Sequence, residues 1–456
     1  MKIFGIHIND FHQFKDFHLD LTYPKGHEKE GLPLEKVCFI GQSGTGKTTL
    51  LNHILESITK LKHISTQFQP HYRIAFNQKT NYSLNSKNRV KSKTEVSFSS
   101  KNHKFILSNG KYGEKKDWDL SIVENKTEAF SDSDKINSIL RKTYTLIEHF
   151  TINYPADINI KHQFVSRKTP DVSYIDKKVV DFNNPKQKLT PIWSKVYKEV
   201  INFQNEEANF RIDLTKKAEI EPIDIKEEIQ KWKKGTSNPL INLANNCLNP
   251  IIKNFGLEIE TDLPRIQNID VIRAKSTLTN KMVPFEKLST GTKQIILTSI
   301  PLYELNTDNS IILIDEPENS LYPDIQQMIV GYYKTLAPKA QFFFATHSPI
   351  IASSFEPWEI VELNFDYDKG RVLQEQYFKG ERHIDNYFIN PQYLRWDSIL
   401  TKVFDIKERG NEKRIEKMMD LAMLGKKIEK ENDKNKRAEM YQEYSKLAGL
   451  LDWETK

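Results

Sequence analysis

Cysteine is nearly absent from this sequence, whose 456 residues include only Cys38 and Cys247. Cys38 lies in an apolar run, where a free cysteine behaves as a small core hydrophobe, so we expect no disulfide or metal role for it. Long apolar runs are absent too: no stretch of about eighteen apolar residues occurs, and the N-terminal stretch 1–8 is too short for a signal peptide. We therefore predict a protein of the reducing cytoplasm with no membrane span.

A strong charge imbalance is also missing. The 67 Lys and Arg residues face 61 Asp and Glu residues, which leaves a net charge of +6. An excess this small allows nucleic acid as a partner without requiring it. Apolar residues make up 38% of the chain and aromatic residues 11%, a composition typical of a folded globular protein with a substantial core. The length suffices for two or three domains, or for one large core with insertions.

A glycine-rich stretch between a strand-like and a helix-like segment organises the chain. It reads Gly41-Gln42-Ser43-Gly44-Thr45-Gly46-Lys47-Thr48-Thr49. The apolar run 37–40 before it predicts a buried strand, and the periodic run 50–55 after it predicts a helix. The three glycines would let backbone N–H groups converge on phosphate oxygens, and the helix N-terminus would add its positive dipole end. We expect Lys47 to contact the β- and γ-phosphates of ATP, Thr48 to bind Mg²⁺, and Thr49 to complete the nucleotide-binding set.

The rest of the chain reads as an α/β head interrupted by insertions. Short alternating runs from 65 to 128, with turns near 85–86 and Asn109-Gly110, predict an antiparallel β lobe. Residues 161–250 are rich in charge and helix formers, with a second helix at 225–234. We predict four regions: 1–160, the N-terminal half of the ATPase head with the β lobe; 161–255, a helical insertion; 256–380, the C-terminal half of the head; and 381–456, a C-terminal helical region.

Two adjacent carboxylates, Asp315 and Glu316, end the apolar run 310–314. At the end of a strand beside a phosphate loop, Asp315 would orient Mg²⁺ through water. Glu316 would orient or deprotonate the attacking water, which makes it the expected catalytic base. The alternative is a buried strand that simply ends in an acidic turn, and the phosphate loop in the same chain favours the catalytic interpretation.

Two further stretches complete the expected site. Leu288-Ser289-Thr290-Gly291-Thr292-Lys293-Gln294 precedes an apolar helix, 295–303, and resembles the signature motif of ATP-binding-cassette ATPases. The structural alternative is that Ser289 only caps this helix. The apolar run 341–346 ends in His347, where such ATPases carry their switch histidine. We therefore expect Ser289 and Gly291 to contact nucleotide and His347 to act in catalysis with Lys47.

Taken together, the motifs resemble the cassette ATPases of the SMC, Rad50, RecF and OLD type. The matching segments are 11–17, 154–157 and 316–323 (Glu-Pro-Glu-Asn-Ser-Leu-Tyr-Pro). The resemblance implies a homo-oligomer in which two subunits sandwich ATP, with Ser289 and Gly291 of one subunit touching the γ-phosphate held by Lys47 of the other. It also implies a Q-loop glutamine, for which we choose Gln163. The family's phosphate-touching arginine is replaced here by His12 or Gln13.

Ser289 lies only 242 positions after Lys47, which leaves too few residues for the long coiled coils of SMC proteins. The resemblance is therefore to compact OLD-like ATPases of antiviral defence systems, Septu-like first and PARIS-like second. There the ATPase works with a separately encoded effector nuclease of HNH or TOPRIM type. Two alternatives stay open: a RecF- or Rad50-like DNA-repair ATPase, and an OLD nuclease. The latter needs a metal-binding Asp-x-Asp pair, but Asp366-Tyr367-Asp368 sits where a hairpin turn would.

Overall fold

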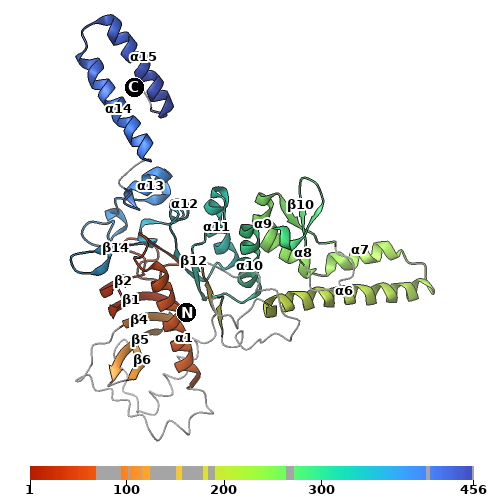
Figure 1. Cartoon of the computed structure of the whole chain (residues 1–456). Helices are drawn as coiled ribbons and strands as arrows, with labels where there is room; N and C mark the ends of the chain where they lie inside the picture. The colour runs from red at the N-terminus through yellow and green to blue at the C-terminus, as the bar shows by residue number, and fades with distance from the viewer. Residues whose placement is uncertain are drawn as a thin grey trace. The chain divides into compact units, whose positions relative to one another are not determined.

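The computed structural model describes residues 1–67, 94–100, 103–112, 115–123, 150–156, 178–182, 190–262, 272–406 and 411–453. The chain divides into two compact units, Met1–Gln392 and Tyr393–Lys456. Within its described residues, the first unit contains a seven-stranded, a five-stranded and a three-stranded sheet together with helices (Figure 1). The predicted α/β fold class is confirmed. Gln163 lies outside the described residues.

The seven-stranded sheet has the order β15-β14-β3-β13-β12-β7-β8. Its strands are β3 (Lys36–Gly41), β7 (Thr151–Tyr154), β8 (Val179–Asp181), β12 (Ile311–Asp315), β13 (Gln341–Ala345), β14 (Ile360–Asp366) and β15 (Arg371–Glu375). Every neighbouring pair is parallel except β14 and β15, which form an antiparallel hairpin. β12 and β13 are buried along their whole length, as expected of parallel strands that are covered on both faces. Because parallel strands share one direction, β3, β12 and β13 end at the same edge.

A five-stranded antiparallel sheet joins the chain's start to the predicted β lobe. Its order is β2-β1-β4-β5-β6, with β1 (Lys2–Phe11), β2 (Phe14–Asp20), β4 (Thr94–Ser100), β5 (His103–Tyr112) and β6 (Lys115–Val123). The chain reverses near Asn109-Gly110 as predicted, but these two residues themselves pair inside the β5–β6 ladder, which continues to the pair Tyr112 and Lys115. Ladder pairing outweighs the local turn preference of Asn-Gly here. The turn predicted at 85–86 lies outside the described residues.

Helix α1 (Lys47–Gln67) lies between the two sheets. Its apolar side chains, together with those of β1 and β2, pack onto one face of β3, β12 and β13 in a single core cluster. This face includes Val37 and Phe39 of β3, while Cys38 between them is equally buried. The core therefore holds the start of α1 against the ends of the central strands.

Helices dominate the region between β8 and β12. It contains α6 (Thr190–Ala218), α7 (Ile225–Gly235), α8 (Pro239–Leu243), α9 (Asn249–Ile252) and the small sheet of β9 (Leu257–Ile259), β10 (Ala274–Ser276) and β11 (Met282–Val283). Asp224 caps α7, and the helix predicted at 225–234 is confirmed. Phe203 and Phe210 of α6 hold the Trp232 ring of α7, with centroids 5.3 and 5.5 Å apart. After β11 come α10 (Thr290–Glu304), α11 (Pro323–Leu336) and α12 (Pro349–Ala352).

The second unit contains α13 (Trp396–Lys402) and a pair of packed helices, α14 (Glu412–Lys430) and α15 (Lys434–Leu450). Leu421, Ala448 and Leu451 form its buried seam. The charge-rich run 426–437 is mostly helical, and the break between α14 and α15 is limited to 431–433. Asp433 ends this break by capping α15. No helix in the described parts of the chain combines the length and apolarity that crossing a membrane requires.

Candidate active site

The glycine-rich stretch forms the loop between β3 and α1. Gly41 has φ +137° and Gly46 has φ +93°, conformations that side-chain-bearing residues rarely adopt. Space is lacking as well: a Cβ on Gly41 would lie 2.3 Å from the carbonyl oxygen of Leu363, and one on Gly46 would lie 2.1 Å from Nε2 of Gln13. Both glycines are therefore required by backbone conformation and by close approach. Thr49, in the first turn of α1, is half-buried.

Lys47 is folded back over this loop. Its ammonium group donates to the carbonyl oxygens of Gly41 at 2.9 Å and Gln42 at 3.2 Å, and the residue is 6% exposed. Burial lowers the pKa of Lys47, against the opposing pull of nearby carboxylates, of which Asp315 is the strongest. An ammonium has three donors, so the two carbonyl contacts orient it and leave a donor for an anion at the loop.

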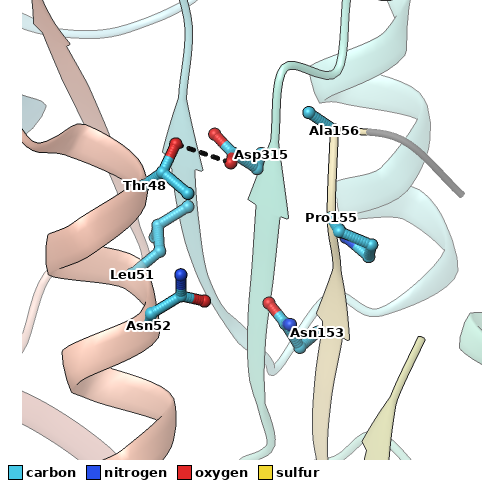
Figure 2. Close-up of a pocket in the computed structure, with 7 residues that line it drawn as sticks. All are labelled: Thr48, Leu51, Asn52, Asn153, Pro155, Ala156 and Asp315. Atoms are coloured by element: carbon cyan, nitrogen blue, oxygen red, sulfur yellow. Dashed lines mark hydrogen bonds between the residues drawn. The ribbon is translucent and has the colours of Figure 1, made fainter. Parts of the chain in front are cut away.

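Thr48 and Asp315 join the two halves of the site, which are separated by more than 260 residues in sequence. The Thr48 hydroxyl donates to Oδ2 of Asp315 at 2.8 Å, and Figure 2 shows the two side chains facing each other between α1 and β12. Burial raises the pKa of Asp315, and the Thr48 hydrogen bond partly offsets this. A cavity of about 230 Å³ opens beside them, lined by Thr48, Leu51, Asn52, Asn153, Pro155, Ala156 and Asp315 (Figure 2). A hydroxyl and a carboxylate are hard oxygen donors that fit Mg²⁺.

Glu316 occupies a left-handed backbone conformation, with φ +49°. Its N–H donates to the carbonyl oxygen of Ala345 at 2.8 Å, so the backbone is pinned between the ends of β12 and β13. Such a conformation costs a glutamate about 1 kcal/mol or more and persists where surrounding contacts enforce it, commonly at active sites. The negative charge of its carboxylate lies close enough to Lys47 and His347 to oppose, without reversing, the lowering of their pKa values by burial.

His347 follows β13, and its side chain is exposed at the same edge of the sheet. Partial desolvation of its ring, followed by the positive charge of Lys47, lowers the pKa of His347. The structure therefore brings His347 to the loop that holds Lys47, as the sequence predicted for its position.

Glu318 was missed as a site residue by the sequence reasoning. Its Oε1 accepts the backbone N–H of His347 at 2.8 Å, and burial raises its pKa. The next residue, Asn319, donates from Nδ2 to the carbonyl oxygen of Ala156 at 2.8 Å. The turn after β12 thus ties together the ends of β13 and β7. The repeated carboxylate in Glu316-Pro317-Glu318 was the available signal.

Gln13, rather than His12, contacts the phosphate loop. The two residues form the turn between β1 and β2, and the Gln13 amide covers Gly46. His12 instead makes an edge contact with Phe11, with ring centroids 4.4 Å apart. From the sequence, either residue could replace the family's arginine. In the structure, the packing of the β1–β2 turn against the loop places Gln13 at this contact.

Ser289 and Gly291 begin α10. Oγ of Ser289 accepts the N–H of Thr292 at 3.1 Å, so the capping interpretation describes its role within the subunit. A Cβ on Gly291 would lie 2.3 Å from the carbonyl oxygen of Ser320, which shows that α10 begins in direct contact with the turn after β12. Within the described residues, neither Ser289 nor Gly291 forms a hydrogen bond with the loop 41–49.

Comparison with known proteins gives one family and several distant relatives. The model of the AAA ATPase domain family matches residues 1–352. The Retron Vc95 probable ATPase of Vibrio cholerae serotype O1 biovar El Tor is 23% identical over 378 residues, which cover 72% of this chain and 69% of that protein.

Among solved structures, an SMC head bound to the C-winged helix domain of ScpA is 12% identical with a TM-score of 0.43, covering 82% of this chain and 97% of its own. The Smc head domain with an extended coiled coil, bound to the C-terminal domain of ScpA derived from Pyrococcus furiosus, is 14% identical with a TM-score of 0.42, and the match covers 82% of this chain and 96% of that one.

Since the family match spans well over half of the sequence and contains the phosphate loop, Asp315 and His347, the chain belongs to the AAA ATPase domain family and is an ATPase.

Proposed function

We propose that this ATPase binds ATP with Mg²⁺ between two subunits and thereby regulates a separately encoded effector nuclease in antiviral defence. The observation that carries the nucleotide part is the hydrogen bond from Thr48 to Asp315. It places the loop-borne hydroxyl and the strand-borne carboxylate at one point, next to the Lys47 ammonium. The ammonium group that would bind phosphate and the two oxygen atoms that would bind Mg²⁺ therefore lie next to one another.

In this proposal each phosphate-contacting group has a separate task. The N–H groups of the loop and of the first turn of α1 bind phosphate oxygens, because the first N–H groups of a helix have no acceptor within the helix. Lys47 adds a cation whose partial burial strengthens its attraction for the β- and γ-phosphates. Thr48 and Asp315 would hold Mg²⁺, which would supply neutralising charge at the phosphate oxygens. Gly41, Gly44 and Gly46 keep side chains out of the cradle.

Glu316 is proposed as the general base for the attacking water. Its strained backbone is fixed by Ala345, so its carboxylate is positioned before the substrate binds. His347 would contact the γ-phosphate or its water from the neighbouring strand end, and its lowered pKa favours a neutral ring at physiological pH. Glu318 would act as a positioning residue, because it holds the His347 backbone.

A second subunit is proposed to complete the site. Among the described residues, Ser289 bonds within α10 and Gly291 packs against the turn after β12, and neither forms a hydrogen bond with the loop 41–49 of its own chain. The N-terminal end of α10 carries N–H groups and a dipole suited to an anion. The γ-phosphate held by Lys47 of a partner subunit would be that anion. Opening and closing of the dimer would then report the ATP state.

An effector encoded elsewhere is favoured over a self-contained nuclease by the hairpin of β14 and β15. Asp366 Oδ1 accepts the N–H of Lys369 at 3.2 Å and its Oδ2 lies 3.8 Å from Arg371, so its carboxylate is used in the turn. The similarity to a protein named Retron Vc95 probable ATPase supports a retron-like setting for this ATPase. We propose an HNH partner, as in Septu-like systems, before a TOPRIM partner, as in PARIS-like systems. The cytoplasm is the proposed location.

The deciding experiment compares Glu316→Gln with Lys47→Ala in ATP binding and in single-turnover hydrolysis. Glu316→Gln should bind ATP normally yet hydrolyse it about 10²–10⁴-fold more slowly, because it keeps the shape and loses the base. Lys47→Ala should lose binding. Glu219→Gln, at an exposed glutamate that follows α6 outside the proposed ATP site, is the matched control and should behave as wild type. Wild-type turnover by Glu316→Gln would contradict the assignment of the catalytic carboxylate.

A further inference from the structure

A second cluster of metal-ligating side chains lies on the β1–β2 hairpin, away from the groups assigned to ATP. We infer that His7, Asp16 and His18 form a binding site for a transition-metal dication of the zinc class. Their ligand atoms, two imidazole nitrogens and one carboxylate oxygen, all lie within 4.8 Å of one another. This inference does not depend on the proposed ATP mechanism.

The antiparallel ladder brings the two histidines together. His7 of β1 and His18 of β2 are register partners, and their rings stack with centroids 3.6 Å apart and an interplanar angle of 16°. Asp16 also lies on β2, and its carboxylate is on the solvent-exposed side with His18, with Oδ1 3.4 Å from Nε2 of that histidine. Its backbone turns into the left-handed region, with φ +50°, between register pairs of the hairpin. The three groups therefore converge from a rigid two-stranded element.

The distances within the cluster match metal ligands better than hydrogen bonds. Oδ1 of Asp16 lies 3.8 Å from Nε2 of His7 and 3.4 Å from Nε2 of His18. A hydrogen bond between such groups would measure about 2.7–3.2 Å. Ligand atoms at about 2.0–2.1 Å from a tetrahedral zinc ion lie roughly 3.3 Å from each other. Small side-chain rotations are enough to reach that geometry.

The donor chemistry points the same way. A metal dication binds neutral imidazole nitrogens and pairs with a carboxylate. Two imidazoles and one carboxylate form a donor set typical of zinc with one open position.

The site is accessible to solvent. The hairpin buries its other face through residues such as Ile8 and Phe17, while the side chains of His18 and Asp16 are 62% and 74% exposed. A metal ion can therefore enter from solution, and water would fill its fourth position. Bound metal would clamp β1 to β2 a few residues from the turn whose Gln13 covers Gly46.

The test uses the full chain after chelator treatment, without ATP and with excess Mg²⁺ to occupy oxygen-donor sites. Zn²⁺ is titrated calorimetrically, and Co²⁺ is followed by its visible absorption, which reports nitrogen and oxygen ligation directly. We expect one Zn²⁺ per chain in the wild type. His18→Ala and Asp16→Asn should each weaken the Zn²⁺ affinity by about tenfold to a hundredfold or more, because even residues that only hydrogen-bond to a metal ligand contribute that much to metal affinity.

Asp16→Asn is chosen because asparagine tolerates a left-handed backbone, so the hairpin should stay intact. Asp10→Asn is the matched control, an exposed aspartate of the same hairpin outside the cluster, and it should bind Zn²⁺ as the wild type does. Zn²⁺ should also raise the unfolding temperature of the wild type and of Asp10→Asn, but not of His18→Ala. Unchanged Zn²⁺ affinity in the double variant His7→Ala/His18→Ala, or a wild type that binds no Zn²⁺, would overturn the inference.

Discussion

His53 should make the stability of the ATPase fall as the pH is lowered. It lies on α1, six residues after Lys47, and it is 2% exposed with its ring 4.6 Å from that of Phe11. Within the described part of the chain, neither ring nitrogen has a hydrogen-bond partner. Burial lowers the pKa of His53 from 6.5 to about 4.

The size of the effect follows from proton linkage. A histidine with a lower pKa in the folded state binds fewer protons there than in the unfolded state, so stability is full above pH 6.5 and falls as the pH drops toward 4. Between pH 7.5 and pH 5 the loss is about 2 kcal/mol, and the limit below pH 4 is about 3 kcal/mol. Protonation would weaken the packing of the helix that carries the phosphate loop.

The assay is urea unfolding of wild type and His53→Leu at both pH values. Leucine has a similar size and no proton to gain, so the variant should lack this part of the pH dependence and should be at least as stable at pH 7.5. His12→Asn, an exposed histidine in the neighbouring turn, is the control and should follow the wild type. Equal losses in wild type and His53→Leu would refute the reasoning, because other titrating groups are common to both.

Three further predictions concern the active site. Gly46→Ala should weaken ATP binding at least about tenfold, because the φ of +93° and the crowded space at this position disfavour a Cβ. Binding of a fluorescent ATP analogue measures this effect. Gly331→Ala is the control and should bind the analogue normally, because Gly331 has open space around it. Mixing inactive Lys47→Ala and Ser289→Arg chains should restore one composite site and part of the ATPase rate, and no recovery in confirmed mixed oligomers would count against the sandwich. The purified chain should not cleave plasmid DNA or tRNA in Mg²⁺ or Mn²⁺; cleavage that is lost in Asp366→Ala would instead favour an OLD nuclease.

The local parts of the site were predictable because each depends on a short stretch of chain. Glycines that need positive φ, an apolar run before them and a helix after them define the loop around Lys47 without any distant contact. The same holds for β12 ending at Asp315 and for Ser289 capping α10. The exact position of the turn near Asn109-Gly110 was not predictable in this way, because pairing with β6 carries the ladder past these two residues.

By itself, then, the sequence determined the phosphate loop, the acidic strand end, the switch strand and the α/β class, since hydrophobic period and backbone preference are local properties. Only the tertiary structure decided that Gln13 covers Gly46 and that Glu318 holds the His347 backbone. It also decided that His7 and His18, on the two strands of one hairpin, become register partners beside Asp16. These pairings follow from strand order and register, which the whole core selects, because shifting a strand by one residue would turn its buried face toward water.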